Sequence, residues 1–283
     1  MLEAHVRPRG PYSLAFSARL AGDATRTFRD GLLRATLVVD ARVERALAWQ
    51  VPDGRVVLRA ESEAGLQRLR FVLAVDDDHT PFLRRFADDP LLGGAVRGLR
   101  GFRPLRVPTV AQALLRALCE QLIDSKTAWL LEKTIVRATT PALDGLHAPP
   151  TTADFARLSP ADLRGLGLHA RRAAALVRIC RSLDLERLRE LPTDAVAARL
   201  ERERGLGPWT AGLVCLLGLG RTERGLVGDL GLIKLCAALH GRLATAGDTA
   251  ALLAPYGEWA GLASLYLLHG WGRGLVPVPR LAA

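Results

Sequence analysis

The sequence predicts an α+β protein in which a small antiparallel sheet precedes a larger helical part. Residues 12 to about 75 contain segments rich in apolar and β-branched residues, such as LLRATLVVD and GRVVLRA, with a VPDG turn between them; this pattern favours antiparallel strands. After residue 108, apolar residues recur at three- and four-residue steps, as in helices. The chain has 283 residues, of which 49% are hydrophobic, enough for two or three modest domains. We therefore expect a sheet domain with helices in residues 1–100 and a helical domain in residues 101–283.

The boundary between these parts lies where the composition changes. The stretch DDDHTPFLRRFADDPLLGG has an acidic run, a proline and then helical spacing, and Pro104 and Pro108 follow it. Thr109 is placed to cap the next helix. That helix is predicted by residues at helical spacing, namely Val110, Leu114, Leu115, Leu118 and Leu122.

Further along, residues 139–155 are expected to form a loop, because prolines, threonines and glycine interrupt the helical spacing there. Residues 159–183 predict two short helices joined at Gly165 and Gly167. The second of them is indicated by Ala173, Leu176, Val177, Cys180 and Leu183.

The formal net charge of +10 is unevenly distributed. Residues 1–100 carry 16 basic and 13 acidic side chains, whereas residues 101–283 carry 23 and 16, so a polyanion is expected on the second part. The four cysteines are too far apart for a metal site and indicate a reducing compartment. The amino-terminal segment has no apolar signal sequence, and the longest apolar run, residues 209–220, is too short to cross a bilayer. We expect a soluble, cytoplasmic protein with no metal and no membrane partner.

The stretch GLGPWTAGLV, from Gly205 to Val214, carries the first functional signal. A helix is expected to end near Arg204, Gly205 and Gly207 to form a tight hairpin with positive φ, and Pro208 to begin the next helix. Such a hairpin directs free backbone amides at a phosphate. Main-chain amides read no bases, so a nucleic-acid strand would be held without sequence preference. Taken alone, a Gly-x-Gly between helices is more often only a turn.

Asp229 follows the hairpin by about twenty residues and directly precedes LGLIKLCAAL. An aspartate in this place is a good helix N-cap, and capping alone explains most such residues. In combination with the hairpin it has a second interpretation: one helix away from a bound strand, its carboxylate would face the sugar.

The whole stretch GLGPWTAGLVCLLGLGRTERGLVGDLGLIKL resembles the helix-hairpin-helix, Gly/Pro-rich loop and aspartate element of the DNA base-excision glycosylases. Within that superfamily it is most similar to the 3-methyladenine DNA glycosylase II (AlkA-like) branch. The segments ALCEQLIDSKTAWLLEKTI, LSPADLRGLGLHARRAAALVRIC and FLRRFADDPLLGG agree in order, so the resemblance covers almost the whole chain. It implies a TBP-like N-terminal sheet domain and two all-α subdomains, with the helix-hairpin-helix at about 196–218 and a catalytic loop and helix at about 225–240.

The resemblance also implies a chemistry, the excision of alkylated, 3-methyladenine-like purines from duplex DNA in base excision repair. Asp229 would be the catalytic carboxylate that stabilises positive charge on the sugar. Trp209 stands where bifunctional relatives have a lysine nucleophile, so no Schiff base forms and an abasic site is left. The expected strand-binding residues are Gly205, Leu206, Gly207, Trp209 and Thr210. No cofactor is required, although the hairpin carbonyls could hold Na⁺ or K⁺, and a monomer is expected.

Base flipping and base recognition involve a second group of residues. Leu122 matches the residue that wedges into the duplex, with Gln121 as a groove contact, but Leu122 equally continues the apolar spacing of its helix. Stacking on aromatic faces would favour a cationic base. The pocket candidates are Trp209, Leu213 and Leu268, with Trp129, Trp259 and Tyr266 as further aromatic residues. The sequence departs from the family pattern at Leu213 and Leu268, which replace aromatics, at Asp124, which replaces serine, and at Arg204, which replaces proline.

Three alternatives remain open from the sequence. A non-catalytic protein of the same fold could bind damaged DNA, or a glycosylase could act on an oxidised or deaminated base, since leucines stand at two pocket positions. A generic helical protein whose charge reflects arginine-rich codon usage would bind DNA without salt dependence, in contrast to phosphate contacts.

Overall fold

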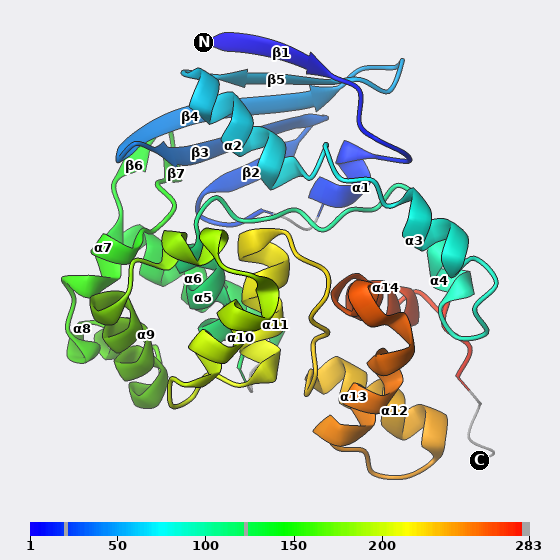
Figure 1. Cartoon of the computed structure of the whole chain (residues 1–283). Coiled ribbons are helices and arrows are strands. Elements are labelled where there is room, and N and C mark those ends of the chain that lie inside the picture. Colours follow the sequence, from blue (N-terminus) through cyan, green and yellow to red (C-terminus); the bar gives the residue numbers. More distant parts are fainter. Residues whose placement is uncertain (20–21, 122–123, 279–283) are drawn as a thin grey trace.

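The computed structural model describes residues 1–19, 22–121 and 124–278. It has a five-stranded antiparallel sheet at one end and helices throughout the rest (Figure 1). The prediction of an α+β fold is confirmed. Leu122 lies outside the described residues, so its proposed place in the duplex stays a prediction.

The sheet has the strand order β1-β5-β4-β3-β2, with every neighbouring pair antiparallel. The VPDG turn joins the two central strands, and its Gly54 N–H donates to the carbonyl of Val51 at 2.9 Å. Helix α2 (Glu63–Leu73) lies across the sheet (Figure 1). Its buried leucines and valine belong to the apolar cluster of the sheet. The strands are β1 Leu2–Val6, β2 Arg26–Arg29, β3 Leu32–Val39, β4 Arg42–Gln50 and β5 Val56–Ala60, and a separate two-residue pair consists of β6 Ala142–Leu143 and β7 Leu146–His147.

The remaining elements are short helices. Local signals place several of their ends: the Thr109 hydroxyl accepts from the backbone N–H of Gln112 at 3.1 Å, as its predicted cap requires, and two helices meet at Gly167. The helices of the first half are α1 Leu14–Ala18, α3 Thr80–Arg85, α4 Gly93–Gly98, α5 Val110–Glu120 and α6 Ser125–Thr139. The later ones are α7 Thr152–Ala156, α8 Pro160–Gly165, α9 Ala170–Ser182, η1 Leu185–Glu190, α10 Thr193–Glu201, α11 Pro208–Leu213, η2 Val214–Leu219, α12 Leu230–His240, α13 Ala246–Leu253, η3 Ala254–Trp259 and α14 Ala260–Trp271.

Two apolar clusters form the core, one beneath the sheet and a larger one among the helices. Helices α3 and α4 precede residue 100, yet their apolar side chains belong to the helical cluster. Phe82 of α3 lies edge-on to Tyr266 of α14, with ring centroids 5.0 Å apart. Residues before position 100 thus contribute to the core of the helical part, and the two apolar clusters do not divide the chain at residue 100.

A buried ionic network joins the sheet to the helices. Asp23 accepts from Arg116 of α5 at 2.7 Å and lies 3.2 Å from Arg26 of β2. Arg116 also donates to Glu132 of α6 at 2.9 Å. Burial alone would raise the pKa of Asp23, but the two guanidinium groups and the hydrogen bonds from Thr25 outweigh it and lower that pKa.

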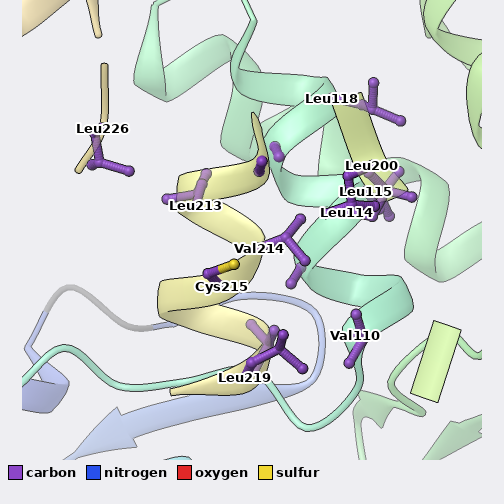
Figure 2. Close-up of a cluster of buried hydrophobic side chains, with 14 of the residues drawn as sticks. Val110, Leu114, Leu115, Leu118, Leu200, Leu213, Val214, Cys215, Leu219 and Leu226 are labelled. Carbon is purple, nitrogen blue, oxygen red and sulfur yellow. The ribbon is translucent and has the colours of Figure 1, made fainter. Parts of the chain in front are cut away.

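The helix that follows the hairpin is anchored on α5. Helix α11 continues into a π-helical segment, η2, where the carbonyl of Leu217 accepts from the backbone N–H of Val107 at 3.0 Å. A Cβ on Gly218 would come within 2.8 Å of Ala113, so glycine permits close packing there. Figure 2 shows Val214 and Leu219 directed at the side of α5. This packing fixes the hairpin relative to α5.

No described helix combines the length and the apolar character that a membrane crossing requires. Within the same residues, no group of three or more His, Cys, Asp or Glu side chains is placed to hold a metal ion.

Candidate active site

The hairpin between α10 and α11 reverses the chain at a single left-handed residue. Gly205 has φ +98°, as predicted, but Gly207 has φ −108° and ψ −175°, so the prediction of positive φ there is wrong. One left-handed residue suffices for the turn, and Gly207 serves as the extended residue before α11. Pro208 begins that helix, as expected. Leu206 is 4% exposed and its backbone N–H donates to the carbonyl of Glu203 at 3.0 Å, so neither its side chain nor its amide is free for a ligand.

Gln121 holds the hairpin in place from the end of α5. Its side-chain amide donates to the carbonyl of Gly205 and to the hydroxyl of Thr210, both at 3.0 Å. Thr210 is itself buried, so its hydroxyl supports the hairpin rather than facing solvent. Gln121 as a groove contact stays a prediction. Asp124, which replaces a serine of the family pattern, caps α6 by accepting from the backbone N–H of Thr127 at 3.0 Å, a role serine also fills.

Asp229 makes contacts with both the following helix and the hairpin. Its Oδ1 accepts from the backbone N–H groups of Gly231 and Leu232 at 2.8 and 3.1 Å, which confirms the N-cap. Its Oδ2 accepts from the indole Nε1–H of Trp209 at 2.9 Å. Both side chains are half-buried. The fold thus joins the hairpin and the carboxylate by a direct hydrogen bond, although twenty residues separate them.

Of the three pocket candidates, Trp209 and Leu268 lie close to Asp229, whereas Leu213 lies in the core. Trp209 touches Asp229, and Leu268 lies beside the same helix start, because a Cβ on Gly231 would be 2.5 Å from Leu268 Cδ2 and 3.0 Å from Asp229 Oδ1. Leu213 is buried in the helical cluster and is 4% exposed (Figure 2). A base held against Asp229 would therefore meet Trp209 and Leu268 rather than Leu213.

The further aromatic candidates lie elsewhere. Tyr266 is fully buried and donates its hydroxyl to the carbonyl of Phe102 at 3.1 Å. Trp259 packs on Phe82 in the same cluster. Trp129 lies on α6, where its indole donates to the Gly22 carbonyl at 2.6 Å. These three side chains have structural partners of their own, which leaves Trp209 as the aromatic candidate in contact with Asp229.

Glu120 is a residue to which the sequence analysis assigned no role. It ends α5 directly before Gln121 and is partly exposed. Burial raises the pKa of its carboxyl to about 7, with the charges of Glu132 and Asp229 acting in the same direction and Arg116 opposing them. In the sequence, Glu120 could have been connected with the site by its place directly before Gln121 and Leu122, the groove and wedge candidates.

Comparison with known proteins provides an independent view. No family model matches the chain. It is 26% identical over 255 residues to a DNA-3-methyladenine glycosylase of Bacillus subtilis (strain 168), an alignment that covers 86% of this chain and 84% of the relative. The structure resembles the 3-methyladenine DNA glycosylase from Archaeoglobus fulgidus, with a TM-score of 0.81, 22% identity and coverage of 94% of this chain and 97% of that one.

The second solved structure is an 8-oxoguanine glycosylase/lyase from Clostridium acetobutylicum in complex with double-stranded DNA. Its TM-score is 0.77 at 16% identity, and the match covers 97% of this chain and 99% of that one. At this level of identity the likeness establishes the fold alone. The fold is therefore one that is shared by glycosylases named for different bases.

Proposed function

We propose that this protein is a monofunctional DNA glycosylase that hydrolyses the N-glycosidic bond of alkylated, 3-methyladenine-like purines in duplex DNA and leaves an abasic site. The observation that carries the proposal is the 2.9 Å hydrogen bond from Trp209 to Asp229, because it ties a carboxylate to the proposed strand-binding hairpin. The name of the Bacillus subtilis relative supports the choice of an alkylated base.

Asp229 suits the charge that develops in this reaction. Breaking the glycosidic bond builds positive charge on the sugar, and a carboxylate fixed in advance near C1′ stabilises it. The backbone amides at the start of α12 hold Oδ1, while the indole of Trp209 holds Oδ2. Oδ1 already accepts two backbone hydrogen bonds, whereas Oδ2 accepts one and keeps acceptor capacity for a sugar or an attacking water. A cationic methylated purine is already a good leaving group, so this carboxylate is enough for it.

The hairpin supplies the proposed grip on the DNA backbone. A Cβ placed on Gly205 or Gly207 would meet no atom of a described residue within 4 Å, so within the described part of the chain both backbones face open space. Arg202 and Arg204 flank the turn and are exposed. Backbone amides and arginines together favour a phosphate without reading sequence. Leu122 would fill the gap left by the flipped base.

The two hairpin glycines separate strand binding from stability. Gly207→Ala has an ordinary φ and open space, so we expect its free energy of unfolding to stay within about 0.5 kcal/mol of wild type. Its duplex affinity should fall roughly tenfold, a cost of about 1.4 kcal/mol, because the methyl group occupies the approach of the phosphate. Gly205→Ala, at φ +98°, should instead lose about 1–2 kcal/mol of stability. Urea unfolding and fluorescence anisotropy on a labelled duplex measure both, and unchanged affinity in Gly207→Ala would place the phosphate elsewhere.

The proposed absence of lyase activity follows from the residue at 209. A Schiff base needs an amine at the sugar, and the segment from Gly205 to Val214 contains no lysine. We expect borohydride treatment of protein incubated with abasic duplex to give no covalent adduct on a denaturing gel. A bifunctional glycosylase run in parallel provides the positive control, and an adduct that maps to this chain would contradict the monofunctional mechanism.

A monovalent cation at the hairpin carbonyls is a separate part of the proposal. The carbonyls of Glu203, Arg204 and Gly205 already accept from Leu206, Arg178 and Gln121. A Na⁺ or K⁺ ion would have to share these oxygens and lie near the Arg178 guanidinium. We therefore assign no step of the reaction to it.

The base preference has a second candidate. Leu268 lies where the family pattern has an aromatic residue, and it lies beside Asp229. Trp209 is the aromatic candidate in contact with Asp229, and a leucine at 268 offers no second aromatic face on which a cationic base could stack. A neutral deaminated or oxidised base is therefore the alternative substrate. A protein that recognises damage without excising it is the other alternative, and Asp229 held by two kinds of donor argues against it.

The proposal is tested with purified wild-type protein and duplexes that each carry one lesion: 3-methyladenine, 7-methylguanine, hypoxanthine or 8-oxoguanine. Free base is measured by chromatography and abasic sites by alkaline cleavage. We expect release of the methylated purines. Release of only an oxidised or deaminated base would change the substrate class, and no release together with binding that weakens steeply with salt would support a recognition protein.

A further inference from the structure

We propose that Glu120 is a second acidic group of this site, a carboxylic acid that donates its proton to a ring nitrogen of a neutral purine lesion as the glycosidic bond breaks. This inference rests on the proposed glycosylase function and extends it from cationic to neutral bases. Asp229 would stabilise the sugar for either class of base, whereas Glu120 would matter only for bases that leave poorly without a proton.

The position of Glu120 is fixed by its neighbour. Gln121 is bonded to Gly205 and to Thr210, and Thr210 directly follows Trp209, whose indole is bonded to Asp229. Glu120 therefore ends α5 directly before the residue that contacts the hairpin, and Asp229 lies near enough for its charge to act on the Glu120 carboxyl.

The carboxyl of Glu120 stabilises no other described part of the chain by a polar contact. It forms no hydrogen bond or ion pair with any described residue, whereas its neighbours Glu132 and Arg116 bond to each other. Among the described residues, its carboxyl oxygens therefore have no protein donor that would occupy them in place of a ligand. The same side chain is partly exposed, so a ligand can reach it.

Its surroundings favour the protonated acid near neutral pH. Burial is the main cause that raises the pKa to about 7, the Glu132 and Asp229 carboxylates add to it, and the Arg116 guanidinium opposes it. The other titratable neighbour on α5 is Cys119, whose pKa burial also raises, so its thiol is neutral. Asp229 instead accepts hydrogen bonds from an indole N–H and from backbone N–H groups at the start of α12. Two nearby carboxyls in unlike environments are the arrangement in which one serves as the acid and the other as the fixed charge.

The proposed step balances as a hydrolysis. The C1′–N9 bond breaks with its electron pair moving to the purine, and the proton of Glu120 passes to N7 or N3 of the ring. Water then attacks C1′, and the proton that it loses returns to the Glu120 carboxylate. The products are the free neutral base and an abasic sugar, with both carboxyls restored.

The test compares wild type, Glu120→Gln and Glu120→Asp in single-turnover excision from duplexes with 7-methylguanine or hypoxanthine. Glu190→Gln, the same change at an exposed position of η1, is the matched control. We expect Glu120→Gln to lower hypoxanthine release by about 100-fold or more and to leave 7-methylguanine release within about threefold. Glu120→Asp should recover part of the hypoxanthine release. In wild type, hypoxanthine release should fall about tenfold per pH unit above pH 7, a slope absent from 7-methylguanine release.

Folding provides a readout that does not depend on activity. Because the folded pKa of Glu120 is raised, stability from this group is complete at low pH and is lost as pH rises through about 7. Glu120→Gln should therefore have the higher urea midpoint at pH 8.5, and the difference should shrink toward pH 5.

The outcomes separate the two proposals. If wild type releases neither of these bases nor 3-methyladenine, the glycosylase function itself fails. If it releases 7-methylguanine but not hypoxanthine, or if Glu120→Gln slows both bases equally or neither, the function stands and the role of Glu120 is overturned.

Discussion

Replacing Asp229 with asparagine is expected to lower the rate of base release by about 100- to 1,000-fold or more, with duplex affinity close to wild type. Asparagine is a good N-cap, so its Oδ1 can still accept from Gly231 and Leu232 and α12 should form. The charge is lost, however, and the new amide group would point its N–H at the indole N–H of Trp209, where a carboxylate oxygen accepts in the wild type. Single-turnover excision from a 7-methylguanine duplex measures the rate, and anisotropy measures binding.

Trp209→Phe is the matched control for this variant. It removes the indole donor but keeps the carboxylate and an aromatic face beside it. The loss of one hydrogen bond to a charged group costs about 1.5–3 kcal/mol and should slow excision by roughly 10- to 150-fold, less than the effect of Asp229→Asn measured in parallel. Excision by Asp229→Asn at a rate near that of wild type would mean that the reaction is supported by another group.

The second large effect is expected on stability. Asp23→Ala should lower the free energy of unfolding by about 3–5 kcal/mol, because it leaves Arg26 and Arg116 buried without the carboxylate that lies between them. Asp53→Ala removes an exposed ion pair with Arg55 and should cost less than about 1 kcal/mol. Urea unfolding at neutral pH compares the two.

The same network should show in the acid limb of wild-type stability. The pKa of Asp23 is lowered in the folded protein, so its contribution is present above the ordinary aspartate range and disappears as pH falls through the folded pKa. The difference in unfolding free energy between wild type and Asp23→Ala should narrow below about pH 4. A difference of less than about 1 kcal/mol at neutral pH would show that the network is not a major source of stability.

The sequence predicted best where a local rule applies. The caps at Thr109 and Asp229 and the proline that begins α11 depend on residues within one turn of the helix end, and all three are confirmed. The hairpin was predicted with two left-handed glycines, and the backbone needs only Gly205 in that region. A Gly-x-Gly pattern does not specify which glycine turns the chain.

Other features depend on contacts between distant segments, which spacing does not encode. Asp23 and Arg116 are 93 residues apart in the chain and were not connected by any pattern. Tyr266 and Trp209 are both aromatic candidates for the base pocket in the sequence. Tyr266 is buried among aromatic rings, whereas Trp209 faces Asp229. The wedge at Leu122 remains a prediction from the sequence.

The packing of α14 against α3 and α4 limits how this protein can be divided. The carboxyl-terminal helices close their core with Phe82 and Ala95 from the first hundred residues, and Leu275 covers Gly94 and Gly98 on α4. A gene fragment that starts at residue 101 would encode Asp229 and the hairpin but leave the apolar side of α14 uncovered. The smallest portion able to fold around the site must therefore include α3 and α4 as well as the carboxyl-terminal helices, so any truncation that removes the sheet has to begin upstream of Thr80.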